Sequence, residues 1–345
     1  MNRLRLLFTA AAIVLLGWTA EASAQQRLRI MEYNVENLFD TIHTAPLLDG
    51  EFTPAGSYHW TERRYWKKLA DISRVIAAVG GDAPPALVAL VEVENDSVVS
   101  HLTRRTRLWR AGYDYVITHS ADARGINVAL LYLPHAFRPV GHDTLRIAPP
   151  RRSSFTRDVL HVAGLIATGD TLDVWVCHWP SRRGGKESEA YRNRVAAVLR
   201  SHIDSVLAVR TTPLAVVTGD FNAFHPEPSV ARHLGAVLPS PTPQTRMLYL
   251  LSAGMEARCG IRGTYKFQGE WNQLDNFAVS GALLAPPRSD CPHTSRERCR
   301  IADFPFLLRD ADSPERIRPY RTFLGTYHQG GFSDHLPLVL DLFIE

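Results

Sequence analysis

The stretch from Pro213 to Ala223 constrains the fold more than any other part of this 345-residue sequence. Pro213 to Val217 is a short apolar run, which predicts a buried strand. The run reaches a glycine and then presents Asp220 and Asn222 on either side of an aromatic residue. Polar groups at the carboxyl end of a core strand are typical of a binding site. An ordinary turn is the alternative interpretation, because Gly-Asp and Asn are also turn residues.

Polar side chains stand at other predicted strand ends as well. Taken singly, each has a structural explanation as a turn former, an ion-pair partner or a satisfied histidine, and Glu94 competes with Glu92 for any role. Taken together, they form an unusual set of carboxylates, amides and histidines without a Gly-x-Ser-x-Gly elbow, a Walker loop or a Gly-x-Gly-x-x-Gly turn. The set comprises Asn34, Glu92, Arg124, Asn127, His178, Asp220, Asn222, Asp275 and Ser333-Asp334-His335.

Residues 1–24 have the pattern of a cleaved signal peptide. Arg3 and Arg5 precede an apolar stretch, and Ala22-Ser23-Ala24 offers small residues for cleavage. The alternative is a membrane anchor, but the apolar stretch is too short to span a bilayer comfortably. We therefore expect a mature chain of residues 25–345 that is periplasmic or secreted, without a stable membrane anchor, and monomeric.

Composition predicts one domain over residues 25–345. The hydrophobic content of 45% suffices for a large core, and no linker or repeat interrupts the chain. A net charge of +4 suits a polyanionic substrate without demanding one. Of the four cysteines, Cys177 is predicted to be a buried thiol, and either Cys291 or Cys299 is a candidate partner for Cys259.

Hydrophobic periodicity predicts helices and strands interspersed along the chain. Several strands are paired like hairpins, which favours mixed or antiparallel sheets covered by helices over a parallel doubly wound sheet. Residues 286–320 are charged and rich in turn formers, and predict a surface loop. Helices are predicted at 61–79, 98–110 and 186–207, and strands at 28–35, 86–91, 113–118, 126–133, 159–166, 172–177, 213–217, 264–267, 274–279 and 338–343.

Six short motifs occur along this sequence in the same order as in the endonuclease/exonuclease/phosphatase superfamily. The sequence resembles this superfamily, in particular its deoxyribonuclease-like, exported bacterial members. The resemblance implies an α+β fold: a four-layer α/β/β/α sandwich of two packed mixed β-sheets with helices outside. The segments that carry it are Tyr33-Asn34, Leu90-Val91-Glu92-Val93, His178-Trp179-Pro180-Ser181, Gly219-Asp220-Phe221-Asn222, Leu274-Asp275 and Ser333-Asp334-His335.

The resemblance also implies metal-assisted hydrolysis of phosphate esters. A hard cation neutralises the charge that grows on phosphate oxygens in the transition state. Glu92 is the expected Mg²⁺ ligand, with Asn34 near it and Asp334 completing the shell. We expect Mn²⁺ to substitute, because it accepts the same type of ligand.

The resemblance also implies roles for the remaining site residues around the substrate phosphate. Asp220 would orient or deprotonate the attacking water, and Asn222 would position that water or the phosphate. Asp275 would pair with His335, and a carboxylate favours the charged form of an imidazole. His178 would face the same phosphate, with the acid and base roles of the two histidines left open. Arg124 is the candidate phosphate clamp.

These expectations favour an exported, Mg²⁺-dependent endonuclease that acts on nucleic acid. A phosphomonoesterase or a sphingomyelinase-like lipid phosphodiesterase is the alternative with the same site, and a binding module without catalysis is a third. Arg151, Arg152, Arg182, Arg183 and Lys186 could contact a nucleic-acid backbone, or could simply form a solvated charged face.

Overall fold

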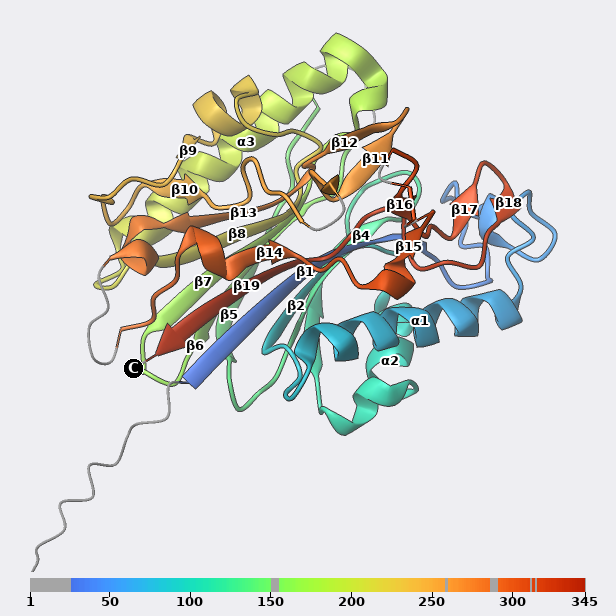
Figure 1. Ribbon diagram of the computed structural model, residues 1–345, viewed down its shortest axis with the longest axis horizontal. Helices are drawn as coiled ribbons and strands as arrows, with labels where there is room; N and C mark the ends of the chain where they lie inside the picture. The colour runs from blue at the N-terminus through green and yellow to red at the C-terminus, as the bar shows by residue number, and fades with distance from the viewer. Residues whose placement is uncertain are drawn as a thin grey trace, which may run out of the picture.

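Two large β-sheets form the centre of the molecule in the computed structural model (Figure 1). The structure describes residues 26–149, 155–257, 260–285, 291–310, 312–313 and 315–344. The expected signal peptide therefore lies outside the described residues, as do Arg151, Arg152 and Cys259.

The first sheet has six strands and both parallel and antiparallel pairs. Strand β1 runs parallel to β2 and antiparallel to β19, so the two ends of the described chain lie side by side. The strand order is β14 (Cys299–Ile301), β19 (Leu338–Ile344), β1 (Gln26–Leu38), β2 (Leu87–Val93), β4 (Asn127–Tyr132) and β3 (Asp114–Ile117).

The second sheet has seven strands and is also mixed. Its central pair, β7 and β8, is parallel, and β13 joins the other side of β8 in antiparallel register. The order is β5 (Arg138–Leu145), β6 (Val159–Leu165), β7 (Thr171–His178), β8 (Leu214–Asp220), β13 (Asp275–Ser280), β10 (Leu248–Leu250) and β9 (Ala236–Val237).

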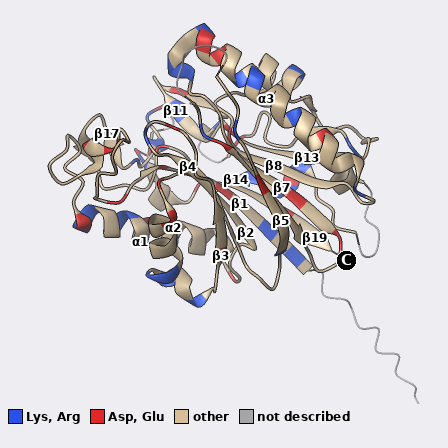
Figure 2. Cartoon of the chain, turned by 180° about the vertical axis from the view of Figure 1, so that it is seen from behind, with Lys and Arg blue, Asp and Glu red and all other residues tan. Residues whose placement is uncertain are grey.

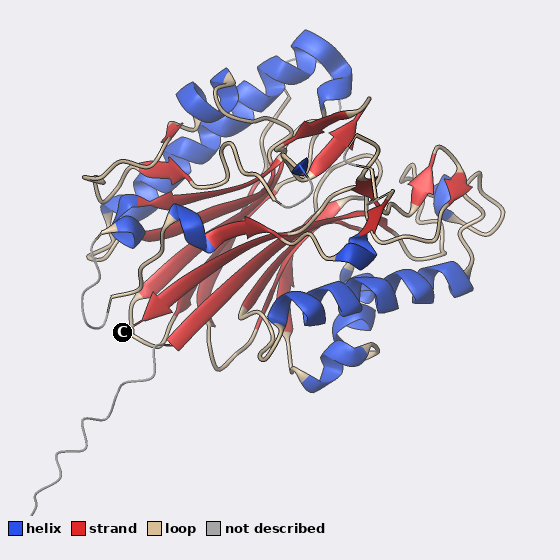
Figure 3. Ribbon diagram, in the orientation of Figure 1, coloured by secondary structure: helices blue, strands red, loops and turns tan. Residues whose placement is uncertain are grey.

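The sheets pack face to face with helices on their outer faces (Figure 3). Helices α1 (Glu62–Gly80) and α2 (Asp96–Arg104) cover the six-stranded sheet, and α3 (Gly185–Ala208) covers the seven-stranded one. The core has two parts, one between the sheets and one between the seven-stranded sheet and α3. Successive residues of a strand point to opposite faces, so Val174 and Val176 of β7 pack between the sheets, whereas Trp175 packs against α3. The predicted four-layer sandwich is confirmed.

Three sequence-based assignments need correction. The helix predicted at 98–110 breaks after Arg104, because the Thr106 hydroxyl accepts a hydrogen bond from Leu108 N and begins a separate 3₁₀ turn, Arg107–Arg110. Strand β5 was not expected, since its side chains are mostly exposed and leave no apolar pattern. The segment predicted as a surface loop contains β14, which forms the edge of the six-stranded sheet beside β19.

Three short hairpins, each a separate two-stranded sheet, lie at the end of the sandwich where the central strands finish. They are β11 (Tyr265–Phe267) with β12 (Glu270–Asn272), β15 (Leu308–Arg309) with β16 (Arg318–Pro319), and β17 (Phe323–Leu324) with β18 (Tyr327–His328). Figure 2 shows Lys and Arg distributed along the outer helices. Within the described ranges, no helix combines the length and apolarity needed to cross a bilayer. Cys177 is a buried thiol, as predicted.

Candidate functional site

Polar residues from both sheets meet at one end of the sandwich. Strand pairing explains much of this convergence, because His178 lies opposite Asp220 in the parallel pair β7 and β8. Asp275 lies opposite Asp220 on the other side, in the antiparallel pair β8 and β13. Asn34 arrives from β1 of the facing sheet, where its Nδ2 donates to Asp220 Oδ2 at 3.2 Å. Two separately predicted strand ends and one facing strand thus surround the Asp220 carboxylate.

Asp220 is buried, and its two oxygens have different partners. Oδ1 accepts from the backbone N–H of Asn222 at 2.8 Å, while Oδ2 accepts from Asn34. Burial first, and then the negative charge of Asp275, raise the pKa of Asp220 to about 7. A carboxylate with such a pKa can exchange a proton near neutral pH, as a general base requires.

Asp275 and His335 form a buried pair. His335 Nδ1 donates to Asp275 Oδ2 at 2.6 Å, and the Thr264 hydroxyl donates to the same oxygen. Burial alone would lower the pKa of His335, but the charge and hydrogen bond of Asp275 outweigh it, so the pKa lies well above its usual value. The sequence predicted this pair, and the structure brings its two members together.

His178 has the opposite electrostatic character. It is buried, and burial followed by the positive charge of Arg157 lowers its pKa well below the usual value. Its Nε2 lies 3.7 Å from both Glu92 Oε1 and Asp220 Oδ2. The two histidines of the site therefore differ in charge at neutral pH, which the sequence did not reveal.

Glu92 and Asn222 both occupy left-handed backbone conformations, with φ of 67° and 48°. At Glu92 the register between β2 and β4 shifts, which marks a bulge that redirects the side chain. Its Oε2 accepts from Asn37 N at 2.8 Å. Asn222 Nδ2 donates to Trp179 O at 3.1 Å. Such conformations cluster at functional sites, where surrounding structure holds them in place.

Two predicted residues have other partners. The Arg124 side chain is 43% exposed and lies 3.7 Å from Asp122, rather than reaching the central carboxylates. Asp334 Oδ2 accepts from Arg321 Nη2 at 2.8 Å. Glu94 turns away from Glu92, because its Oε2 accepts from Asp40 N at 2.6 Å.

Arg157 is a residue of this site that sequence reasoning missed. It is buried, and its Nη2 donates to Trp179 O at 2.6 Å. Burial lowers its pKa, while the negative charges of Asp122, Glu92 and Asp220 oppose that change. Arg157 therefore lies buried within the field of the central carboxylates, whereas the Arg124 side chain is 43% exposed. Its only sequence signal is a charged residue just before β6.

Glu32 was also missed, although the alternation of β1 places it on the same face as Asn34. It is fully buried and interacts with Asp275 of the facing sheet. Burial, followed by the charge of Asp275, raises the pKa of Glu32 well above its usual value. Its position two residues before Asn34 on the same strand was the signal that could have found it.

A buried lysine supports the loop that carries Asp334 and His335. Lys68 Nζ donates to Phe332 O at 2.8 Å and to Glu36 O at 3.2 Å. The Glu36 carboxylate accepts from the backbone N–H of Thr322 at 2.6 Å and of Phe323 at 3.0 Å. These bonds tie the chain before the loop to β1 and α1.

A second set of bonds fixes the loop itself. Ser333 Oγ donates to Asn34 O at 2.7 Å and accepts from His335 N at 3.1 Å. The serine of the Ser-Asp-His motif therefore connects His335 directly to β1.

The donor set suits a divalent cation. Ligand atoms of Asp220, Asp275 and His335 lie within 4.8 Å of one another, and Glu92 adds a further carboxylate, which like Asp220 lies 3.7 Å from His178 Nε2. Hard cations prefer such oxygens, and a positive charge would offset the repulsion that raises the pKa of Asp220. Asn34, Glu92 and Asp334 remain the predicted ligand set, with Asp220 as an additional candidate.

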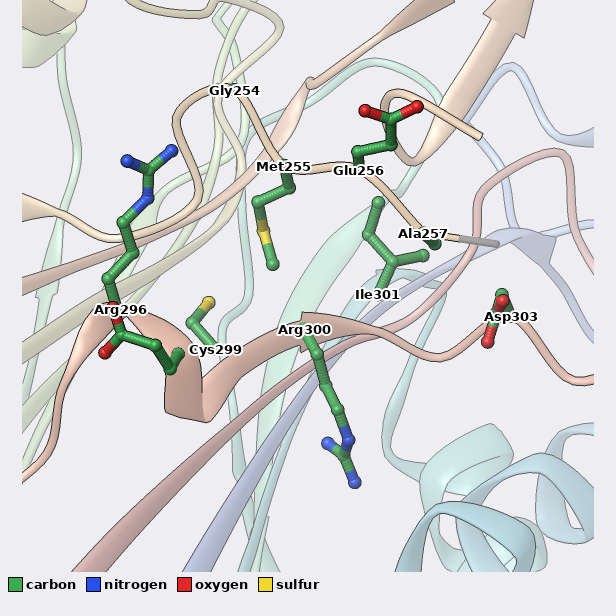
Figure 4. Close-up of a pocket in the computed structure, with 10 residues that line it drawn as sticks. Gly254, Met255, Glu256, Ala257, Arg296, Cys299, Arg300, Ile301 and Asp303 are labelled. Carbon is green, nitrogen blue, oxygen red and sulfur yellow. The ribbon is translucent and has the colours of Figure 1, made fainter. Parts of the chain in front are cut away.

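A cavity of about 640 Å³ opens elsewhere, between the segment 254–257 and strand β14 (Figure 4). Arg296, Arg300 and Glu256 line it, together with Met255 and Cys299. No residue of the predicted site takes part in this lining, so the cavity is separate from the cluster around Asp220.

Comparison with known proteins agrees with this picture. The family described as "Endonuclease/Exonuclease/phosphatase family" matches residues 29–343. A family protein from Bacteroides thetaiotaomicron is similar in structure, with a TM-score of 0.58, 15% identity, and coverage of 93% of this chain and 99% of that one. No curated protein matches the sequence significantly.

Two TDP2 structures are also similar in fold. One is D. rerio TDP2 complexed with a single-strand DNA product, with a TM-score of 0.54, 14% identity, and coverage of 92% of this chain and 98% of that one. The other is truncated Caenorhabditis elegans TDP2, with a TM-score of 0.53, 15% identity, and coverage of 92% and 98%.

Proposed function

This chain belongs to the endonuclease/exonuclease/phosphatase family, whose members hydrolyse phosphoester bonds, and on that premise we propose that it is an exported, divalent-metal-dependent endonuclease. The observation that carries the proposal is the convergence of the Asp220, Asp275 and Glu92 carboxylates with His178 and His335 at one end of the sandwich. A bound Mg²⁺ or Mn²⁺ ion would supply positive charge at the phosphate oxygens.

Asp220 receives the proton of the attacking water in this proposal. Its place between the ends of β7 and β13 supports the assignment, because a general base must lie within reach of the proton that it accepts. Asn34 and the N–H of Asn222 orient the carboxylate through one hydrogen bond to each oxygen. The water that Asp220 activates would attack the phosphorus from the side facing this carboxylate.

His335 is the charged histidine and His178 the neutral one. Charged His335 would stabilise a non-bridging phosphate oxygen, with Asp275 holding its ring. Neutral His178 would accept or donate one hydrogen bond at the same phosphate. We assign the phosphate clamp to Arg157, with Arg124 contacting the substrate further out.

Nucleic acid is the proposed substrate. The mildly basic sequence supports it, as does the fold likeness to a TDP2 that was crystallised with a DNA product. The proposed location, periplasmic or secreted, rests on the pattern of residues 1–24.

A lipid phosphodiesterase is a second candidate, because one hairpin exposes apolar side chains. In β17–β18, Tyr327 is 79% exposed and Leu324 is 48% exposed. An exposed hairpin with an aromatic residue can insert into the headgroup region of a bilayer, although the same tyrosine could stack on a base.

The test is hydrolysis by residues 25–345 with Mg²⁺ or with EDTA, against supercoiled DNA, single-stranded DNA, RNA, sphingomyelin vesicles and a phosphomonoester. The Asp220→Ala variant is the control. We expect EDTA-sensitive nicking of DNA that the variant lacks. Turnover of only the vesicles or the monoester would overturn the substrate class, and full activity of a folded Asp220→Ala protein would overturn the site.

A further inference from the structure

A second cluster of metal-ligating side chains lies on the opposite face of the seven-stranded sheet from His178. Asp143 of β5 and His161 of β6 are direct cross-strand neighbours, and His161 lies opposite Trp175 of β7. Residues opposite one another in antiparallel register share a face, so His161 points toward α3 with Trp175. His202 of α3 lies above them, with its ring 5.2 Å from that of His161.

His161 is held in one orientation by its neighbours. Its Nε2 lies 2.9 Å from Asp173 Oδ1, and its ring stacks on Trp175 with centroids 4.4 Å apart. Arg210 binds Asp173 through two bonds, of 2.7 Å and 2.8 Å, which keeps that carboxylate charged. The Nε2 of His161 therefore carries its proton and donates to Asp173.

The other ring nitrogen of His161, Nδ1, has Asp143 as its neighbour. The His161 side chain is 4% exposed, and its Nδ1 has no hydrogen-bond partner among the described residues. The carboxylate of Asp143 faces this nitrogen, with Oδ2 at a distance of 3.6 Å. Metal-ligating histidines commonly donate one N–H to a carboxylate, as His161 does to Asp173, and bind the metal through the other nitrogen.

His202 completes the set. One ligand atom each from Asp143, His161 and His202 lies within 4.8 Å of the other two. Trp175 Nε1 donates to His202 Nδ1 at 3.1 Å, and coordination through that nitrogen would replace this hydrogen bond.

We propose that Asp143, His161 and His202 form a zinc site that is separate from the phosphoester chemistry and fastens α3 to strands β5 and β6. Two imidazoles and one carboxylate suit Zn²⁺, whereas Mg²⁺ prefers oxygen ligands and would remain at the other site. The Asp143 side chain is 70% exposed, so water can reach the cation as a fourth ligand. This inference does not depend on the proposed function.

The test measures Zn²⁺ binding to chelator-treated protein, residues 25–345, by equilibrium dialysis with excess Mg²⁺ present. We expect His202→Gln to bind one Zn²⁺ equivalent fewer than the wild type, or to bind it at least ~10-fold more weakly. His142→Gln is the matched control, because His142 is an exposed histidine beside Asp143 on the same strand. It should bind zinc as the wild type does.

Thermal unfolding provides an independent measurement. Zn²⁺ should raise the melting temperature of the wild type and of His142→Gln, but not that of His202→Gln, because only a cation bound to the folded state stabilises it. Co²⁺ should give the visible absorption of a tetrahedral site in the first two proteins only. Equal zinc stoichiometry and affinity in His202→Gln and wild type would overturn the proposal, as would absence of zinc binding by the wild type.

Discussion

Gly219 is the position where one added methyl group tests most directly how the fold places the site. Its φ is 128°, a conformation that side-chain-bearing residues rarely adopt. A Cβ at this position would lie 2.0 Å from Cys177 O and 2.8 Å from Cys177 N. Atoms in contact lie roughly 3.5 Å apart, so β7 and β8 would have to separate by about 1 Å or more. Asp220 and His178, at the ends of those strands, would move with them.

The expected effects of Gly219→Ala follow from these distances. Backbone strain contributes about 1–3 kcal/mol and overpacking a further ~1–3 kcal/mol, which together reduce the free energy of unfolding by about 2–6 kcal/mol. At roughly 2–4 °C per kcal/mol, the melting temperature should fall by about 4–24 °C. A displacement of ~1 Å at a catalytic group lowers turnover about 100-fold.

The measurements are thermal unfolding and turnover of the substrate that the wild type hydrolyses fastest, at a temperature where both proteins are folded. Gly141→Ala is the matched control, because Gly141 lies in β5, has no positive φ, and has nothing within 4 Å of its added Cβ. The reasoning is refuted if Gly219→Ala melts and turns over within error of Gly141→Ala.

Three further perturbations test separate parts of the structure. Asp275→Asn removes the charge that raises the pKa of His335. We expect turnover to fall ~100-fold or more and the His335 limb of the pH–rate profile to move to lower pH. An unchanged profile would contradict the pairing of Asp275 with His335. Burial, followed by the charges of Arg64 and Lys67, lowers the pKa of His328 to about 4. As the pH falls, the unfolded state therefore takes up a proton before the folded state does. The contribution of His328 to the free energy of unfolding should be full above its unfolded pKa of about 6.5 and decline toward pH 4. His328→Phe should flatten that decline in melting temperature, and equal slopes would argue against it. Lys68→Met removes the buried hydrogen bonds to Glu36 O and Phe332 O, of which Phe332 O keeps the Thr322 hydroxyl as a donor, and should cost about 2–5 kcal/mol in urea unfolding. A loss under ~0.5 kcal/mol would show that other groups replace these bonds.

The sequence allowed the strands of the sandwich to be predicted because their residues are buried on both faces. Strand β8 is buried along its whole length, and its first four residues, 214–217, are a continuous apolar run. Strand β5 has no such pattern, because its side chains are mostly exposed on the edge of the sheet. The edge strand β14 is only three residues long and follows a charged 3₁₀ turn, so its pairing with β19 depends on tertiary contact alone.

The candidate site also contains residues that could be predicted from the sequence and residues that could not. Asp220, Asp275 and His335 could be predicted, because each stands beside an apolar strand where a polar residue is out of place. Arg157 could not, since its burial results from packing against Trp179 and Asp122, residues distant in sequence.

The charge states of the two histidines also depend on tertiary contacts. His335 and His178 are both buried, but His335 is hydrogen-bonded to Asp275, whereas at His178 the charge of Arg157 adds to the effect of burial. A sequence motif specifies the residue type but not the sign of the charge beside it.

The site is assembled across the interface between the sheets, and this has a consequence for specificity. Asn34 and Glu92 come from one sheet, and His178, Asp220 and Asp275 from the other, so their mutual positions are set by the core between them. A well-packed core resists deformation, which makes the reacting geometry stiff. The hairpin β17–β18 belongs to neither sheet. Substrate choice can therefore change through such a hairpin while the catalytic arrangement stays the same, which is how one fold serves several phosphoester substrates.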